Sequence, residues 1–177
     1  MDRRSLSRLA VEMSTSPYVI AAGAATISSA AIGGLFYAFS TFVMKGLDRC
    51  EPAEALRAMR GINAEAQANA PFLIFFMGST LLAAVVGVLA ALRWSQPGSA
   101  YLVVGAVLSV LAFAVTMAFN VPLNNHLDGL DPSALSAADA LSEWRAYLVT
   151  WTNWNHVRTV TPLVGSVLML IGVRSLP

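Results

Sequence analysis

Four long stretches without a charged residue or a histidine dominate the chain: Tyr18–Met44, Pro71–Leu92, Tyr101–Val121 and Val160–Val173. A helix of roughly 20 residues crosses the hydrocarbon core of a bilayer, and the first three stretches reach that length. The fourth reaches it only if its helix begins inside the polar motif that precedes it. The pattern predicts an all-α fold, a transmembrane four-helix bundle with short interfacial helices in the two long loops. We expect spans at about 18–44, 70–93, 100–122 and 154–173.

Composition supports a membrane protein and excludes other classes. Of the 177 residues, 56% are hydrophobic and only 12% are charged, whereas about 25% are charged in a soluble domain. We expect one transmembrane domain over residues 1–177. The net charge of +1 is uninformative, and the lack of a basic cluster argues against a nucleic-acid partner. The single cysteine, Cys50, excludes an internal disulfide and a paired-thiol redox centre.

Local signals divide the chain between the spans. Asn69 is expected to cap the second helix, and Pro122 to end the third. Asp131 followed by Pro132 predicts the start of a separate helix in the second long loop. Small residues at Ala30, Gly34 and Ala38 predict a face for close helix packing, which allows either a monomer or a homo-oligomer.

The distribution of basic residues predicts the orientation. Arg3, Arg4 and Arg8 precede the first stretch, and Arg174 follows the last. By the positive-inside rule both termini lie in the cytoplasm, with the plasma (inner) membrane as the location. The first stretch is longer than the 7–15 apolar residues of a signal peptide, so it is expected to remain as a membrane anchor.

The segment from Trp151 to Thr159 carries the candidate chemistry. It places tryptophans, asparagines, an imidazole and a guanidinium at a membrane edge. Trp151, Asn155 and Arg158 share one face of a helix because they are four and three residues apart. A guanidinium at that depth is costly unless it is paired, and ionisable groups within a membrane mark functional sites.

Both long loops lie on one side of the membrane, so polar residues near the span ends are expected to meet there in one pocket. This pocket would receive a lipophilic aromatic molecule. Its expected polar residues are Asn63, Glu65, Asn69, Asn124, Asn125, His156 and Arg158. Its expected aromatic walls are Trp144, Tyr147, Trp151 and Trp154.

Other interpretations of the same residues remain open. The tryptophans are also typical of the aromatic belt at a membrane surface, and Arg158 can reach the phosphates of membrane lipids. A non-enzymatic scaffold or lipid-binding protein would use them in that way. A single copper or iron held by His156, His126 and Glu65 is a further alternative, although the spacing of these residues does not require a metal.

Three segments of the sequence resemble the anthrone oxygenase-like family of small four-helix membrane proteins. They are Gly34–Ser40, Asn120–Asn125 and Trp151–Thr159. The resemblance implies oxidation of polyketide anthrones to anthraquinones by an oxygenase. Carried over by position, it implicates Asn63, Asn124, Asn125, Trp151, His156 and Arg158.

The chemistry that this implies begins with an acidic methylene group. His156 is the expected base, because an imidazole accepts protons near neutral pH. Arg158 and the amides of Asn124 and Asn125 would stabilise the phenolate-like anion. Tryptophan faces would hold the flat polycycle, and the anion would react directly with dioxygen to give a quinone. No cofactor is required on this hypothesis, and a copper- or iron-dependent oxidase is its alternative.

Overall fold

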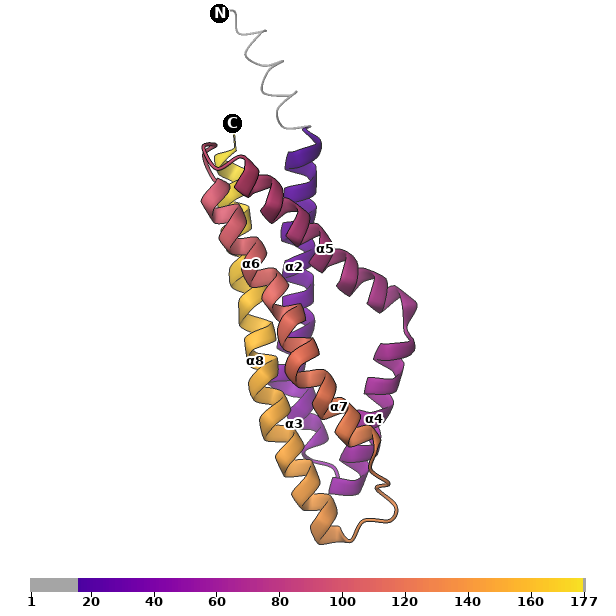
Figure 1. Cartoon of the computed structure of the whole chain (residues 1–177). Coiled ribbons are helices and arrows are strands. Elements are labelled where there is room, and N and C mark those ends of the chain that lie inside the picture. The colour runs from indigo at the N-terminus through magenta and orange to yellow at the C-terminus, as the bar shows by residue number, and fades with distance from the viewer. Residues whose placement is uncertain (1–15, 177) are drawn as a thin grey trace, which may run out of the picture.

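The computed structural model describes residues 16–176, and these residues form helices without any strand. Four helical runs are long and apolar enough to cross a membrane: Pro17–Leu47, Ala70–Leu92, Ser99–Asp128 and Ala137–Ser175. They lie side by side as a bundle (Figure 1). The predicted all-α fold with four membrane-spanning helices is therefore confirmed.

Two of the four runs are interrupted by a short π-helix. The elements, in the labels of Figure 1, are α2 (Pro17–Ala38), η1 (Phe39–Val43), α3 (Met44–Leu47), α4 (Pro52–Ala68), α5 (Ala70–Leu92), α6 (Ser99–Val115), η2 (Thr116–Asn120), α7 (Val121–Asp128) and α8 (Ala137–Ser175). The π-helices η1 and η2 continue α2 and α6 without a break.

Helix α8 is the central helix of the bundle and packs against both α2 and α6. Its 39 residues extend over about 58 Å, roughly twice the thickness of a hydrocarbon core. The predicted separate helix beginning at Asp131 is wrong, because the segment with Trp144 and Tyr147 is the first half of α8. Ser136 caps this helix by accepting a bond from the backbone of Asp139, whereas Asp131 accepts one from Ser133 within a turn.

The third helical run does not end at Pro122, as the sequence predicted. It continues through α7 to Asp128. A proline removes one amide hydrogen and pushes against the preceding turn. The π-helix Thr116–Asn120 lies directly before this proline and widens the turn that would otherwise clash with the ring.

The first long loop contains α4, which packs against α7 and α8. Together with the first half of α8 it encloses a core of its own, built from Met44, Ala55, Leu56, Met59, Leu127, Ala140, Trp144, Tyr147 and Trp151. Only Asn69 separates α4 from α5, and it caps α5 as predicted, with Oδ1 accepting from the amide of Phe72 at 2.9 Å. Figure 1 shows that α5 leans away from the other helices toward this junction.

Glycines allow the closest helix contacts. Gly105 of α6 and Gly165 of α8 face each other so tightly that a Cβ on either would lie 2.6 Å from the carbonyl oxygen of the other. On α2 the tight contact is at Gly33, which meets Leu163, whereas Gly34 is exposed and has nothing within 4 Å. The predicted packing face was therefore displaced by one residue.

The beginning of α2 and the end of α8 lie at the same end of the bundle (Figure 1). Arg3, Arg4 and Arg8, on which the predicted orientation depended, lie outside the described residues. The cytoplasmic position of the termini stays a prediction.

The glycine contact between α6 and α8 can be tested by substitution. We expect Gly165→Ala to destabilise the protein by about 1–3 kcal/mol, because the added methyl group would force the two backbones apart. Gly34→Ala is the matched control and should leave the melting temperature unchanged or slightly higher, since alanine favours a helix. Thermal unfolding in mild detergent, followed by circular dichroism, measures both. Equal melting temperatures for the two variants would contradict this account.

Candidate functional site

The lean of α5 leaves a cavity of about 310 Å³ between α4, α5 and the other helices. This volume is near the lower end of the range for small-molecule pockets, about 300–1,000 Å³. Its walls are almost entirely apolar, and phenylalanines contribute much of them. The lining residues include Leu35, Phe36, Phe39, Met59, Ile62, Asn63, Ala66, Gln67, Phe72, Leu73, Phe76, Met77, Phe113, Thr116, Met117, Val121, Asn124, Trp151 and Arg158.

Arg158 is the one charged residue that lines this cavity, and its side chain is only 4% exposed. Its Nη2 donates to Oδ1 of Asn155 at 2.7 Å, and Nη1 lies 3.4 Å from Oγ1 of Thr116. The guanidinium carbon lies 4.4 Å from the ring centre of Phe36 and 4.9 Å from that of Trp151. The Nε atom is buried and has no hydrogen-bond partner.

No carboxylate within residues 16–176 neutralises this guanidinium. The ion pairs of the described chain are elsewhere, between Arg60 and Asp128 at 3.6 Å and between His126 and Glu143 at 3.0 Å. Amide and aromatic contacts lower the cost of burying a cation, but they supply no opposite charge. The site therefore has the electrostatics of an anion-binding site.

Asn155 holds the guanidinium in place and is itself fully buried. Its Nδ2 donates to the carbonyl oxygen of Phe36 and to Oγ of Ser40, both at 2.8 Å. Phe36 and Ser40 lie where α2 passes into the π-helix η1. The position of Arg158 thus depends on this irregular part of the first span.

Asn124 presents its amide group to the cavity in a fixed orientation. Its Oδ1 accepts two hydrogen bonds of 2.9 Å, from the hydroxyl of Tyr147 and from Nε1 of Trp151. Both are donors to that oxygen, so the NH₂ group must be on the other side. That group donates to no residue within 16–176. Asn63 lies beside it, with Nδ2 3.4 Å from the hydroxyl of Tyr147.

The cavity is bordered by apolar side chains on the outer surface of the bundle. Leu73 and Met77 of α5 are 38% and 50% exposed, and Met117 of η2 is 51% exposed. These residues lie on helices that can cross a membrane. A lipophilic molecule can therefore approach the cavity from the side that faces lipid.

Several of the predicted site residues do converge. Asn63, Asn124, Trp151 and Arg158 line the one cavity. Tyr147 lies directly behind Asn124, to which it is hydrogen-bonded. Trp144 is one turn earlier in α8 and donates to Asp48 instead of lining the cavity.

The prediction that His156 faces the same pocket as Arg158 is wrong. Two residues along a helix turn the side chain by about 200°, so the two side chains face nearly opposite directions. His156 is exposed and lines a separate groove of about 340 Å³, together with Lys45, Asp48 and Asn153. Its Nδ1 lies 3.0 Å from Oγ of Ser40.

The remaining polar and aromatic candidates also lie outside the cavity. Asn125 is exposed, about 100° around its helix from Asn124. Trp154 stacks on Phe119 with ring centres 3.5 Å apart.

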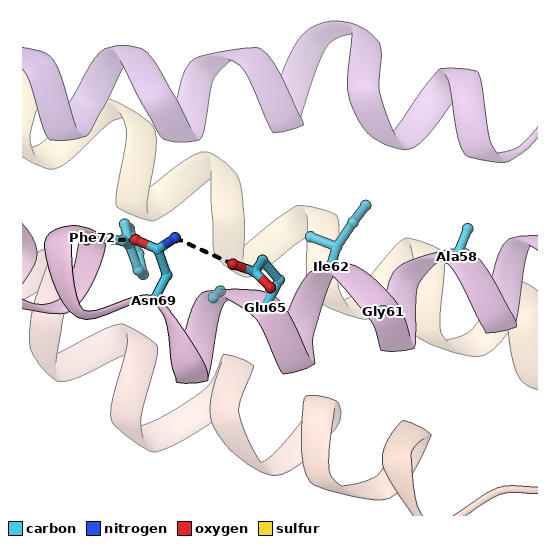
Figure 2. A pocket seen from close by; sticks show the side chains of 7 residues that line it. Ala58, Gly61, Ile62, Glu65, Asn69 and Phe72 are labelled. Atoms are coloured by element: carbon cyan, nitrogen blue, oxygen red, sulfur yellow. Dashed lines mark hydrogen bonds between the residues drawn. The ribbon is translucent and has the colours of Figure 1, made fainter.

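Glu65 and Asn69 lie at the junction of α4 and α5, where Nδ2 of Asn69 donates to Glu65 at 3.2 Å (Figure 2). They line a different hollow from the cavity that contains Arg158. The expectation that they join the same pocket is therefore wrong.

The alternative metal ligands are not brought together. His126 pairs with Glu143, Glu65 with Asn69, and His156 with Ser40. Among residues 16–176 no group of three His, Cys, Asp or Glu side chains is placed to hold a metal ion.

Ser40 and Thr116 were not expected from the sequence, and Asn155 was expected on the face of Arg158 without a role of its own. Ser40 and Thr116 are small polar residues inside apolar spans, where such residues usually bond to the preceding turn of their own helix. The sequence held one indication of Ser40, which lies at the end of the segment Gly34–Ser40 that resembles the anthrone oxygenase-like family. The two π-helices that aim these hydroxyls toward Arg158 have no sequence signature of their own.

A protein-family model described as anthrone oxygenase matches residues 72–168. The matched region includes Asn124, Tyr147, Trp151 and Arg158, but not Asn63 or Ser40. No curated protein and no solved structure matches the chain.

The unpaired charge leads to a prediction about stability. We expect Arg158→Met to melt at or above the wild-type temperature, because it removes a buried cation that has no carboxylate partner. Asn155→Ala should lower stability by about 1–3 kcal/mol, since it leaves Arg158 without its acceptor. Thermal unfolding in detergent compares the two. A loss in Arg158→Met as large as that in Asn155→Ala would mean that Arg158 is a structural residue.

Proposed function

Because the chain belongs to the anthrone oxygenase family, we propose that it oxidises a flat, phenolic, anthrone-like substrate with dioxygen to the corresponding quinone. The observation that carries this proposal is the guanidinium of Arg158, which is buried without a carboxylate at the wall of an aromatic cavity. The missing negative charge would be supplied by the substrate.

The electrostatics favour a substrate that binds as an anion. A buried cation attracts an opposite charge more strongly than an exposed one, because the surroundings screen it less. An anthrone can lose a proton from the methylene group between its rings, and the charge then moves to the ketone oxygen. A phenolate-like oxygen beside Arg158 would neutralise the guanidinium, and the acidity of the bound substrate would rise.

Hydrogen-bond donors in the cavity match such an oxygen. Arg158 has only donors, and the NH₂ group of Asn124 has no partner within residues 16–176. Both groups are held in position before the substrate arrives, Arg158 by Asn155 and Asn124 by Tyr147 and Trp151. Fixed donors of this kind stabilise developing negative charge at little cost of reorganisation.

The apolar walls suit the rest of the substrate. Phe36, Phe72, Phe76 and Phe113 surround the cavity, and Trp151 lies next to Arg158. Fused aromatic rings would be buried against these side chains. A substrate dissolved in the bilayer would enter past the exposed side chains of α5 and η2.

The reaction balances without a further reductant. The substrate loses a methylene proton to water near exposed Gln67 at the α4 end of the cavity. The resulting anion passes one electron to dioxygen, and the superoxide and carbon radical combine to form a peroxide. Protonation of the peroxide, cleavage of its O–O bond and loss of the second methylene hydrogen give the new carbonyl and one molecule of water. The electrons come from the substrate, so the proposal requires no metal or organic cofactor.

Oxygen uptake tests the proposal directly. With dithranol, a dihydroxyanthrone, the protein in mild detergent should consume oxygen and form the anthraquinone faster than empty micelles do. Arg158→Met should lower kcat by about 100-fold or more, the usual effect of removing an anion-stabilising donor. Arg174→Met, which removes an exposed arginine in the last turn of α8, is the matched control and should retain full activity.

Two results would overturn the proposal. One is oxygen uptake no faster than in empty micelles. The other is full activity in Arg158→Met, because the anion would then be stabilised elsewhere. Activity that disappears after chelation and returns with copper or iron would favour the metal-dependent alternative.

A further inference from the structure

The hydrogen bonds around Ser40 assign a role to His156, and this role rests on the proposed function of Arg158. We infer that His156 is a positioning residue for the anion site. It donates a hydrogen bond from Nδ1 to Ser40, and through Ser40 and Asn155 it fixes the guanidinium of Arg158. His156 thereby acts on the cavity from the opposite face of α8.

The direction of each hydrogen bond follows from Arg158, which can only donate. Asn155 must therefore turn its Oδ1 toward Nη2 of Arg158, at 2.7 Å. The amide nitrogen of Asn155 then faces the carbonyl oxygen of Phe36 and Oγ of Ser40, both at 2.8 Å. Its two hydrogens are both used, and Ser40 is an acceptor in its bond with Asn155.

The hydroxyl of Thr159 bears on which oxygen donates in its contact with Ser40. Its Oγ1 lies 2.9 Å from the backbone oxygen of Asn155, which can only accept, so Thr159 is the donor in that bond. The oxygen atoms of Ser40 and Thr159 are 3.1 Å apart. While Thr159 keeps its bond to Asn155, the hydrogen in the contact with Ser40 comes from Ser40.

The contact between Ser40 and His156 is then determined. Ser40 has one hydrogen, and it points to Thr159. The imidazole Nδ1, 3.0 Å from Oγ of Ser40, must therefore carry a hydrogen and donate it. The opposite arrangement, with Ser40 donating to His156, would require Thr159 to give up its bond to the backbone oxygen of Asn155 and turn its hydrogen to Ser40.

This arrangement separates His156 from proton transfer in the cavity. Its Nδ1 already carries a hydrogen, and the amide of Asn155, which lies between Ser40 and Arg158, does not readily relay protons. The series of hydrogen bonds transmits only the positions of the side chains. A donor on Nδ1 holds Ser40, Ser40 holds Asn155, and Asn155 holds Arg158. Partners of this kind typically change activity by about 10- to 100-fold.

The protonation pattern of the ring can be measured without any substrate. The chain has two histidines, so His126→Gln leaves one imidazole for ¹⁵N NMR. At a pH where the ring is neutral, we expect Nδ1 to carry the hydrogen and Nε2 to carry none. Ser40→Ala should shift the ring toward a hydrogen on Nε2. If the His156 ring carries its hydrogen on Nε2 while Ser40 is present, the inference is wrong.

Activity then distinguishes a positioning residue from a base. An asparagine at this position can place an N–H near the site of Nδ1 but cannot act as a base. His156→Asn should therefore keep kcat/KM close to the wild-type value, whereas His156→Ala should lose about 10- to 100-fold. His126→Asn, at an exposed histidine paired with Glu143, is the matched control and should have no effect.

The outcomes separate this inference from the proposed function. Equal losses in His156→Asn and His156→Ala would mean that the ring itself transfers a proton or binds a metal. Full activity in His156→Ala would mean that the chain of bonds does not control Arg158. Inactive wild-type protein would refute the proposed function, while the NMR result would still decide the direction of the network.

Discussion

A guanidinium buried without a carboxylate is the constraint on which the polar network inside this bundle depends. Arg158 lies in a helix that can cross a membrane, and its contacts within the described chain are amides, a hydroxyl and aromatic rings. Burial of a cation is unfavourable, so every neighbouring element must offer oxygen atoms or ring faces to it. The first span supplies Phe36 and, through Asn155, Ser40, and the third span supplies Thr116. The bundle is thus organised around one charge.

The two π-helices have a common role in this arrangement. η1 begins next to Ala38 and includes Ser40, and η2 begins with Thr116. A π-helical turn contains an extra residue, so it changes which side chains face a neighbouring helix. Each of them directs a hydroxyl toward the surroundings of Arg158. Such turns are found frequently at functional sites, and these two face the same helix.

The sequence predicted the helices better than it predicted their faces. Apolar length identified three of the four spans, and the fourth was found by counting the polar motif before it. The spacing of Trp151, Asn155 and Arg158 placed them correctly on one face. The prediction that Asn124 and Asn125, and likewise Arg158 and His156, line the same pocket was wrong. Residues one or two positions apart in a helix face different directions. Helix ends were missed where tertiary packing overrode a local signal, as at Pro122 and at Asp131. The π-helices could not be predicted, because they depend on contacts between distant segments.

The cavity wall consists of two kinds of surface. One part, formed by α2, the run from α6 to α7, and α8, carries the charge and its hydrogen-bond network. The other part, formed by α4 and α5, joins the bundle through mainly apolar contacts and supplies about half of the residues that line the cavity. The buried charge and about half of the cavity wall therefore lie in separate parts of the chain. Substitutions in α4 and α5 can change the shape of the cavity while the surroundings of Arg158 stay unchanged.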